Sequence, residues 1–330
     1  MIKTDVVIIG TGSIALKHAS IINEFYPDLD ITLYNYRKRV FSKQKKIDKE
    51  ILSLFNNIID DHSEIQPYAH QSFAIVASPS SHHIEHALLF AKKKFHILCE
   101  KPLTNKTSVL KNLIKVLNQN SLSSHVGYNM RFLESLAFLK NIIDKKIFGN
   151  ILSSNISVQT NFTTWRPNKL YKKTSTALRS LGGGVVNELS HEIDYMNYIF
   201  GQPDFQKSVV HKSKKLDLDV YDICNARFLY SKYKVDVSLD MLSSIEKRIC
   251  YIKFDKASVL LNFKTNILHI LKIKGEDSAH FFEKDMNDTY IDQIKYFMKK
   301  IKNKITNKTD ISSYAVLTKS LLRMNNTPNG

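Results

Sequence analysis

The stretch Val6-Val7-Ile8-Ile9-Gly10-Thr11-Gly12-Ser13-Ile14-Ala15 decides the fold of this chain. Its four apolar residues predict a buried strand, and the glycine-rich turn after them opens a helix predicted over 14–25. Gly10 permits the tight turn, Gly12 lets backbone approach a phosphate, and Ala15 is small enough for close helix–strand packing. The free N–H groups at the helix start attract phosphate oxygens. The stretch therefore predicts a dinucleotide-binding turn formed by Gly10, Thr11, Gly12, Ser13 and Ile14.

Short apolar strands alternate with helices through the first third of the sequence. The apolar patterns predict further strands over 31–34, 73–77 and 95–99, and helices over 82–93 and 108–118. Such alternation is typical of a parallel sheet that helices cover on both faces. The fold class is therefore α/β, and it begins with a Rossmann domain.

The pattern changes after about residue 125, where long segments of alternating apolar and polar residues begin. They predict strands over 151–163, 226–239, 249–254, 258–263 and 267–273, and helices follow over 285–302 and 312–324. We therefore expect a second α/β domain with a large, mostly antiparallel open sheet. The expected domains are an NAD(P)-binding Rossmann domain over 1–125 and a substrate-binding and oligomerisation domain over 126–330. Because open apolar sheet faces seek cover, we expect a homodimer or homotetramer through this sheet.

Composition restricts the location of the chain and its metal chemistry. The 330 residues are 43% hydrophobic, yet they contain no apolar run of the ~18 residues that a membrane span needs. The apolar run at 6–9 is too short for a signal peptide, so we expect a cytoplasmic protein with no membrane partner. Cys99, Cys224 and Cys250 are far apart and form no CxxC pair. We therefore expect neither a disulfide framework nor a metal site.

The formal net charge of +17 has two interpretations, and both stay open. Runs such as 43–46 and 92–94 are typical of solvated helix faces. The excess charge also suits anionic ligands, such as cofactor phosphates or an acidic sugar. No helix-turn-helix pattern accompanies the charge, so we expect no nucleic-acid partner.

The residue at the end of the second strand bears on which cofactor is preferred. NAD-binding proteins place an acid there, which bonds the ribose 2′-OH. This sequence has the neutral Asn35, followed by Arg37 and Lys38. A neutral residue with guanidinium nearby accommodates a 2′-phosphate, so the sequence predicts NADP in preference to NAD.

Glu100-Lys101-Pro102 comes directly after the strand predicted over 95–99. Ligands of doubly wound sheets bind beyond the carboxyl ends of the strands, so Lys101 is expected in the cofactor crevice. Pro102 fixes the turn and restricts the backbone before it. A lysine at such a place can hydrogen-bond a substrate hydroxyl and share its proton.

Four segments together resemble the glucose–fructose oxidoreductase/inositol dehydrogenase (Gfo/Idh/MocA) family over nearly the whole chain. They are Ala77-Ser78-Pro79-Ser80-Ser81-His82-His83, Cys99-Glu100-Lys101-Pro102-Leu103, Gly127-Tyr128-Asn129-Met130-Arg131-Phe132 and the run from Gly182-Gly183-Gly184 to His191. The resemblance implies an NAD(P)-dependent oxidoreductase. It also implies further cofactor contacts from Ser78, Pro79, His83, Glu100, Lys101 and Asn129.

The same resemblance implies the catalytic residues. In this family the lysine of Glu-Lys-Pro and a histidine after the glycine run flank the substrate at the nicotinamide, which here implies Lys101 and His191. The family's aspartate position is taken by Glu188, and His191 follows after three residues, which keeps the two on one helical face. Glu192 and Asp194 are alternative groups to orient the imidazole. Glu-x-x-His also suits a metal, but the sequence has no second such pair.

These residue types suit the oxidation of an alcohol. Histidine can accept the hydroxyl proton near neutral pH, and lysine can stabilise the developing alkoxide. A loop with Trp165, Arg166 and Tyr171 precedes the glycine run, and Arg166 could grip a carboxylate or phosphate. Trp165 and Tyr171 either stack on a sugar or simply pack. The predicted substrate contacts are Lys101, Asn129, Arg131, Trp165, Arg166, Tyr171, Glu188 and His191.

We therefore expect hydride transfer to or from a secondary alcohol or ketone of a sugar derivative. The segment 190–195 resembles members encoded with bacterial surface-sugar pathways, which implies an acidic, amino or nucleotide-linked sugar. Two alternatives stay open. One is a glycoside hydrolase that uses NAD for transient oxidation, and the other is a non-catalytic, cofactor-sensing regulator.

Overall fold

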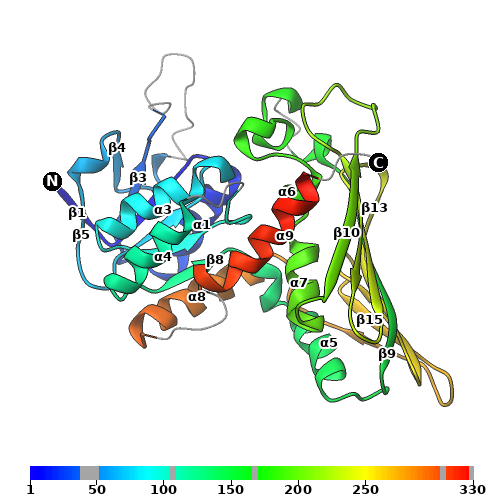
Figure 1. The fold of residues 1–330 in the computed structure, drawn as a ribbon. Helices are drawn as coiled ribbons and strands as arrows, with labels where there is room; N and C mark the ends of the chain where they lie inside the picture. The colour runs from blue at the N-terminus through cyan, green and yellow to red at the C-terminus, as the bar shows by residue number, and fades with distance from the viewer. Residues whose placement is uncertain (38–51, 105–108, 166–169, 305–309, 327–330) are drawn as a thin grey trace. The chain divides into compact units, whose positions relative to one another are not determined.

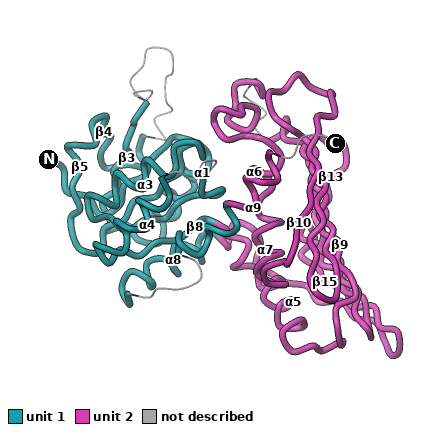
Figure 2. The backbone as a smooth tube through the Cα atoms, in the orientation of Figure 1, with its two compact units in different colours: residues 1–127, 290–318 teal, residues 128–289, 319–330 magenta. Residues whose placement is uncertain are grey.

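The chain forms two compact units in a computed structural model that describes residues 1–37, 52–104, 109–165, 170–304 and 310–326 (Figure 1). Unit 1 contains residues 1–127 and 290–318, and unit 2 contains residues 128–289 and 319–330 (Figure 2). The expected boundary at 125/126 is close to the first of these divisions. The C-terminal part differs from expectation, because residues 290–318 return to the N-terminal unit rather than to the second one.

Unit 1 contains a six-stranded parallel sheet of order β4-β3-β2-β6-β7-β8, as predicted for a Rossmann domain. A separate parallel pair joins β1 to β5. The strands are β1 (Ile2–Thr4), β2 (Val6–Ile9), β3 (Ile31–Tyr34), β4 (Asn57–Ile59), β5 (Ile65–Pro67), β6 (Phe73–Val76), β7 (His96–Cys99) and β8 (Ser124–Val126).

Helices cover both faces of this sheet because its strands are apolar throughout. One face packs alternate strand residues, such as Val6 and Ile8, against α1 and against Ile294 and Phe297 of α8. Helix α3 packs on β6 and β7, and α4 lies beside α3. The helices are α1 (Ser13–Phe25), α3 (His83–Lys92), α4 (Leu110–Gln119) and α8 (Asp288–Lys302).

Unit 2 contains an eight-stranded sheet of order β10-β11-β12-β9-β13-β14-β15-β16. Neighbouring strands are antiparallel except β12 and β9, which are parallel, so the predicted open and mostly antiparallel sheet is confirmed. The strands are β9 (Ile151–Asn161), β10 (Phe205–His211), β11 (Ile223–Leu229), β12 (Lys234–Asp240), β13 (Leu242–Phe254), β14 (Ala257–Asn262), β15 (Ile267–Lys272) and β16 (Ser278–Phe281).

One strand prediction in this sheet is wrong. Residues 226–239 were expected as a single strand, but the structure forms the hairpin β11–β12, closed by a hydrogen bond from Tyr230 N to Tyr233 O. The turn 230–233 contains neither glycine nor proline. The alternation of apolar and polar residues therefore continues through the turn without the glycine or proline that usually marks one.

Helices lie against one face of the eight-stranded sheet. Contacts join α7 to β9, α6 to β11 and β12, and α5 to α7. These helices are α5 (Glu134–Asp144), α6 (Val185–Glu188) and α7 (His191–Phe200), and α9 (Ala315–Asn325) ends the described chain. Short 3-10 turns occupy 62–64, 80–82, 129–132, 162–164, 171–173, 175–177, 179–181 and 311–314.

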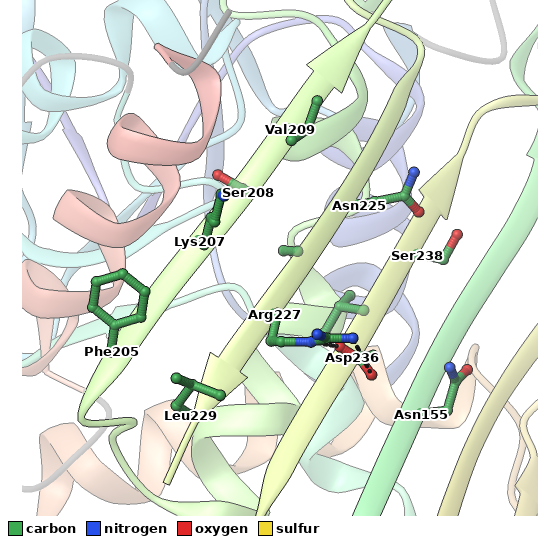
Figure 3. Close-up of a pocket in the computed structure, with 12 residues that line it drawn as sticks. Asn155, Phe205, Lys207, Ser208, Val209, Asn225, Arg227, Leu229, Asp236 and Ser238 are labelled. Atoms are coloured by element: carbon green, nitrogen blue, oxygen red, sulfur yellow. Dashed lines mark hydrogen bonds and ion pairs between the residues drawn. The ribbon is translucent and has the colours of Figure 1, made fainter. Parts of the chain in front are cut away.

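The other face of the sheet carries a pocket of about 490 Å³ over β9 to β12 (Figure 3). Phe205, Val209 and Leu229 line it together with the Arg227–Asp236 ion pair. None of its lining residues is a predicted cofactor or substrate residue, so this pocket is separate from the candidate site.

In the part of the chain that the structure describes, no helix is long and apolar enough to span a membrane.

Candidate active site

The glycine turn of unit 1 joins β2 to α1 as the sequence predicts. Gly10 has φ +117°, and a Cβ at this position would lie 2.7 Å from the carbonyl oxygen of Ala77. Gly12 is the N-cap of α1, which begins with no capping side chain and no acidic residue in its first turn. A Cβ on Gly12 would meet nothing within 4 Å, while Ala15 is buried. The turn therefore presents open backbone and free N–H groups at the helix start, as a pyrophosphate requires.

The Glu-Lys-Pro turn follows β7 and is fixed through the carboxylate of Glu100. Its Oε1 lies 2.8 Å from Nε2 of His18 on α1, and its Oε2 accepts the Lys101 backbone N–H at 3.2 Å. A Cβ on Gly127 would lie 2.9 Å from this carboxyl group, so Gly127 makes room for it. Lys101 itself is half-buried, and its bond to Pro102 is cis. Glu100, expected at the cofactor, is thus a buried group that holds the turn carrying Lys101.

His83 lies between two turns of the same unit. Its Nε2 is 2.7 Å from the Ser78 carbonyl oxygen and its Nδ1 is 2.9 Å from the Pro102 carbonyl oxygen. Burial lowers the pKa of His83, which favours the neutral ring, and a neutral ring donates to only one of the two carbonyls. His83, expected at the cofactor, therefore couples the Ser78–Pro79 turn to the Glu-Lys-Pro turn.

The end of β3 places Asn35 beside the end of β4. Asn35 is 3% exposed, its N–H donates to Ile59 O at 2.8 Å, and its Nδ2 donates to Asp60 Oδ1 at 2.7 Å. The guanidinium of Arg37 lies over the Tyr36 ring, 5.3 Å from its centroid. Lys38 lies outside the described residues.

In unit 2, the glycine run supports the loop that precedes it. A Cβ on Gly183 would come within 2.3 Å of Thr176 O and 2.4 Å of Ser175 O, and Gly184 N donates to Thr176 O. Gly184 has φ +106° and caps α6. Only glycines allow the 171–181 segment to pack this closely on the backbone that leads to α6.

Glu188 and His191 belong to two helices rather than one. Glu188 ends α6 and His191 begins α7, with Leu189 and Ser190 between them. The prediction that one continuous helix carries both on one face is therefore wrong. Leu189, with ψ +29°, leaves the helical conformation, so spacing along the sequence does not set their geometry. His191 is buried, and its ring meets Tyr128 edge-on with centroids 5.6 Å apart.

Two ion pairs with buried carboxylates hold α7 directly after His191. Arg131 binds Asp194 through two bonds of 2.7 and 2.9 Å, and Arg248 binds Glu192 through bonds of 2.7 and 3.3 Å. Burial raises the pKa of Asp194 and Arg131 opposes this shift. The structure thus gives arginine partners to both acids that the sequence offered as orienting groups. It also gives Arg131, a predicted substrate contact, a partner within its own unit.

The remaining predicted substrate residues of unit 2 lie in separate places. Asn129 is buried and donates to Thr289 Oγ1 at 2.7 Å. Trp165 is 39% exposed, bonds Thr160 through Nε1 and packs edge-on against Phe162.

Tyr171 meets Phe162 edge-on as well, with ring centroids 6.1 Å apart. Trp165 and Tyr171 therefore both pack against Phe162. Trp165 is partly exposed, so stacking on a sugar stays a prediction for it. Arg166 lies outside the described residues.

Sequence reasoning missed three residues of unit 1: His18, Asp60 and His86, whose Nδ1 lies 2.9 Å from Ser78 Oγ. His18 follows the glycine turn on α1, but its partner Glu100 is 82 positions away, so no local pattern reveals the contact. Asp60 follows a three-residue strand that the apolar pattern did not reveal. Among the described residues, no group of three His, Cys, Asp or Glu side chains is arranged to hold a metal ion.

The glycine turn and the parallel sheet define a Rossmann-type dinucleotide-binding fold, and one known family matches the N-terminal part of the chain. Residues 4–128 match the family described as "Oxidoreductase family, NAD-binding Rossmann fold" (Gfo/Idh/MocA). The match does not extend to the eight-stranded sheet of unit 2.

The chain is 30% identical to glucose-6-phosphate 3-dehydrogenase of Bacillus subtilis over 212 residues, which are 61% of this chain and 55% of that protein. The match thus spans about half the length of this curated relative.

Two solved structures share the fold over nearly their whole length. A levoglucosan dehydrogenase in complex with NADH and levoglucosan has a TM-score of 0.79 at 17% identity, covering 99% of this chain and 96% of that one. A UDP-N-acetylglucosamine 3-dehydrogenase from Acidithiobacillus ferrooxidans has a TM-score of 0.72 at 16% identity, covering 98% and 97%.

Proposed function

We propose that this chain is a nicotinamide-dependent oxidoreductase that moves a hydride to or from a secondary alcohol carbon of a sugar derivative. The observation that carries the proposal is the glycine turn, whose open backbone at the start of α1 lies in the same unit as Lys101. The match of residues 4–128 to an NAD-binding oxidoreductase family supports it. So do relatives whose names describe sugar dehydrogenases.

A dinucleotide fits the residues present, because Gly12 faces open space and α1 begins without a capping side chain. The nicotinamide would supply the hydride acceptor or donor. The residues proposed to hold the cofactor are Gly10, Thr11, Gly12, Ser13, Ile14, Asn35, Arg37, Ser78, Pro79 and Lys101. We propose that Glu100 and His83 act on this cofactor site through the turns that they hold.

We propose that two side chains carry the acid–base work. His191 accepts the hydroxyl proton of the substrate, because a neutral imidazole is a base of suitable strength near neutral pH. The Lys101 ammonium donates a hydrogen bond to a substrate hydroxyl oxygen and stabilises the negative charge that develops there. Glu188 supports His191. In the reverse direction the same groups return the proton to the carbonyl oxygen.

The proposed substrate is an anionic sugar, with a phosphate, a carboxylate or a linked nucleotide. Lys172, Lys173 and Arg179 lie on the 171–181 segment packed against the glycine run, and such basic groups suit an anion. Asn129, Trp165, Arg166 and Tyr171 stay predicted contacts. A role in surface-glycan biosynthesis and a cytoplasmic location also stay predictions.

We further propose that a second copy of the chain covers the open sheet face of unit 2. Phe205 is 58% exposed there, next to Leu229 and to the Arg227–Asp236 pair. A face with apolar groups and both signs of charge is suited to a twofold contact with itself. Light scattering after size exclusion should give a dimer or tetramer, and Phe205→Glu should shift it toward monomer. A wild-type monomer at micromolar concentration contradicts this part.

The test of the activity is turnover with a panel of sugars, each supplied with NAD and with NADP. Glucose 6-phosphate, UDP-N-acetylglucosamine, a sialic acid and levoglucosan cover the substrate classes at issue. We expect one anionic sugar to give stoichiometric reduced cofactor, and Lys101→Met and His191→Asn to remove the activity. Lys92→Met, on the exposed face of α3, is the matched control.

The alternatives predict different outcomes. A glycoside hydrolase would release sugar with no net cofactor reduction, and a regulator would bind cofactor with no turnover of any sugar.

A further inference from the structure

In unit 1, the strands β3 and β4 end side by side. The two strands are parallel neighbours, with Tyr34 opposite Ile59. Asn35 and Asp60 are the next residues of the two strands, and their side chains meet at 2.7 Å. Asn35 is also fixed through its main chain, since its N–H donates to Ile59 O. The amide is therefore held at both its backbone and its side chain.

The hydrogen bond to Asp60 fixes the orientation of the Asn35 side-chain amide. A carboxylate only accepts hydrogen bonds, so the nitrogen end of Asn35 must face Asp60. The oxygen end, Oδ1, then points away from Asp60. At the end of the second strand of a Rossmann unit, this is the position that meets the adenosine ribose. The carboxylate of Asp60 consequently lies directly behind the side chain of Asn35 at this position.

A negative charge at this position discriminates between the two nicotinamide cofactors. The 2′-OH of NAD is uncharged and is not repelled by a carboxylate. The 2′-phosphate of NADP carries a charge of about −1.5 to −2 at neutral pH, so the Asp60 carboxylate opposes it. Asp60 and Asp61 already contribute, after burial, to a raised pKa of Tyr34 at the same strand end.

The guanidinium of Arg37, which favoured NADP in the sequence, faces an aromatic ring. The guanidinium of Arg37 lies over the Tyr36 ring, and its charge contributes to lowering the pKa of His86, whose ring packs 4.6 Å from that of Tyr36. Arg37 is thus directed at an aromatic cluster, whereas Asp60 is bonded directly to Asn35.

We propose that Asp60, acting through the amide of Asn35, makes this chain select NAD(H) over NADP(H). Asp60 is a specificity-determining residue that the sequence did not reveal, and its effect reverses the preference expected from Asn35 and Arg37 alone. The proposal rests on the proposed function only in requiring that the glycine turn binds a nicotinamide dinucleotide.

The test measures dissociation constants of NADH and NADPH for the whole chain, from the fluorescence of the reduced nicotinamide, without any substrate. We expect the wild type to bind NADH at least tenfold more tightly than NADPH. Asp60→Asn should reduce this ratio about tenfold, mainly by tightening NADPH, because it removes the charge and keeps the shape. A wild type that prefers NADPH or binds both equally overturns the proposal.

Asp61→Asn is the matched control. It removes the same charge one residue further on, where the carboxylate accepts the N–H of Ser63. A general electrostatic effect would change the ratio equally in both variants and would overturn the role of Asn35. In an Asn35→Ser background, Asp60→Asn should change the ratio much less, as a double-mutant cycle requires for a coupled pair.

Cofactor binding by the wild type distinguishes failure of the proposed function from failure of the NAD(H) selectivity. If neither cofactor binds to the wild type, the proposed function and this inference both fall. If NADH and NADPH bind with equal affinity, only the inference falls.

Discussion

The two units position their proposed catalytic side chains by different physical means. In unit 1, Lys101 follows a carboxylate that is held by a buried histidine and by the close approach of Gly127. In unit 2, the helix that begins at His191 is anchored by two buried carboxylates, each paired with a partly buried arginine. The first arrangement depends on hydrogen bonds and backbone space, and the second on paired charges. Loss of a single partner should therefore have different consequences in the two units.

The largest expected effect is on turnover, from the two side chains proposed to handle the proton. Lys101→Met and His191→Asn should each lower kcat by ~10²–10⁴-fold, the range typical of general acid–base groups. The melting temperature of Lys101→Met should stay close to wild type, because Lys101 is half-exposed. A kcat within threefold of wild type for either variant would remove that residue from the mechanism.

The next effect is on stability and belongs to unit 2. Arg131→Met leaves the carboxylate of Asp194 buried without its guanidinium and should cost about 3–5 kcal/mol of unfolding free energy. Arg131→Met/Asp194→Leu should recover much of the loss, because no buried charge remains. Urea denaturation measures both variants.

Arg227→Met is the control for this prediction, since it breaks a two-bonded arginine–aspartate pair that is exposed. It should change stability far less. Equal losses for the buried and exposed pairs would contradict the role given to burial.

Two glycine substitutions compare backbone space in the two units. Gly183→Ala places a Cβ against two carbonyl oxygens and should cost about 1–3 kcal/mol, as overpacking does. Gly12→Ala meets open space at φ −79°, so the fold should tolerate it. The same methyl group should weaken NADH binding about tenfold, because it occupies the surface that a pyrophosphate approaches. Thermal unfolding together with NADH titration separates the two outcomes.

The smallest expected effect is on the free energy of unfolding at acidic pH, and it arises in the histidine-rich unit 1. Burial, followed by the neighbouring His82, His83 and Arg37, lowers the pKa of His86 to about 3. The unfolded chain binds a proton at this residue below about pH 6.5, whereas the folded chain stays neutral there until about pH 3. Stability should therefore fall as the pH falls through this window.

His86→Gln removes this linkage and should recover about 1 kcal/mol of the loss at pH 5.5, relative to pH 7. Urea denaturation at the two pH values measures the difference. An unchanged pH dependence in the variant would show that His86 does not titrate in this way.

The sequence predicted those parts of the molecule whose signals are local. The turn at Gly10–Gly12 and the Glu-Lys-Pro turn lie next to the strands that define them, and both occur where expected. The Arg131–Asp194 pair joins residues far apart in the chain, which a single sequence does not connect. The break between α6 and α7 was missed as well. Two short helices have the same periodicity as one, and no glycine or proline marks Leu189.

The return of residues 290–318 to unit 1 has a consequence for biosynthesis. Ile294, Phe297 and Ile301 of α8 complete the hydrophobic core that β2, β3 and α1 begin. The ribosome makes residues 1–127 long before it makes this helix, so unit 1 of the nascent chain has an unfilled apolar surface until α8 has been translated. The early-translated residues of unit 1 therefore reach their native packing only after α8 is made. A fragment that stops at residue 127 should need help from chaperones, or from α8 supplied as a separate peptide, to stay in solution.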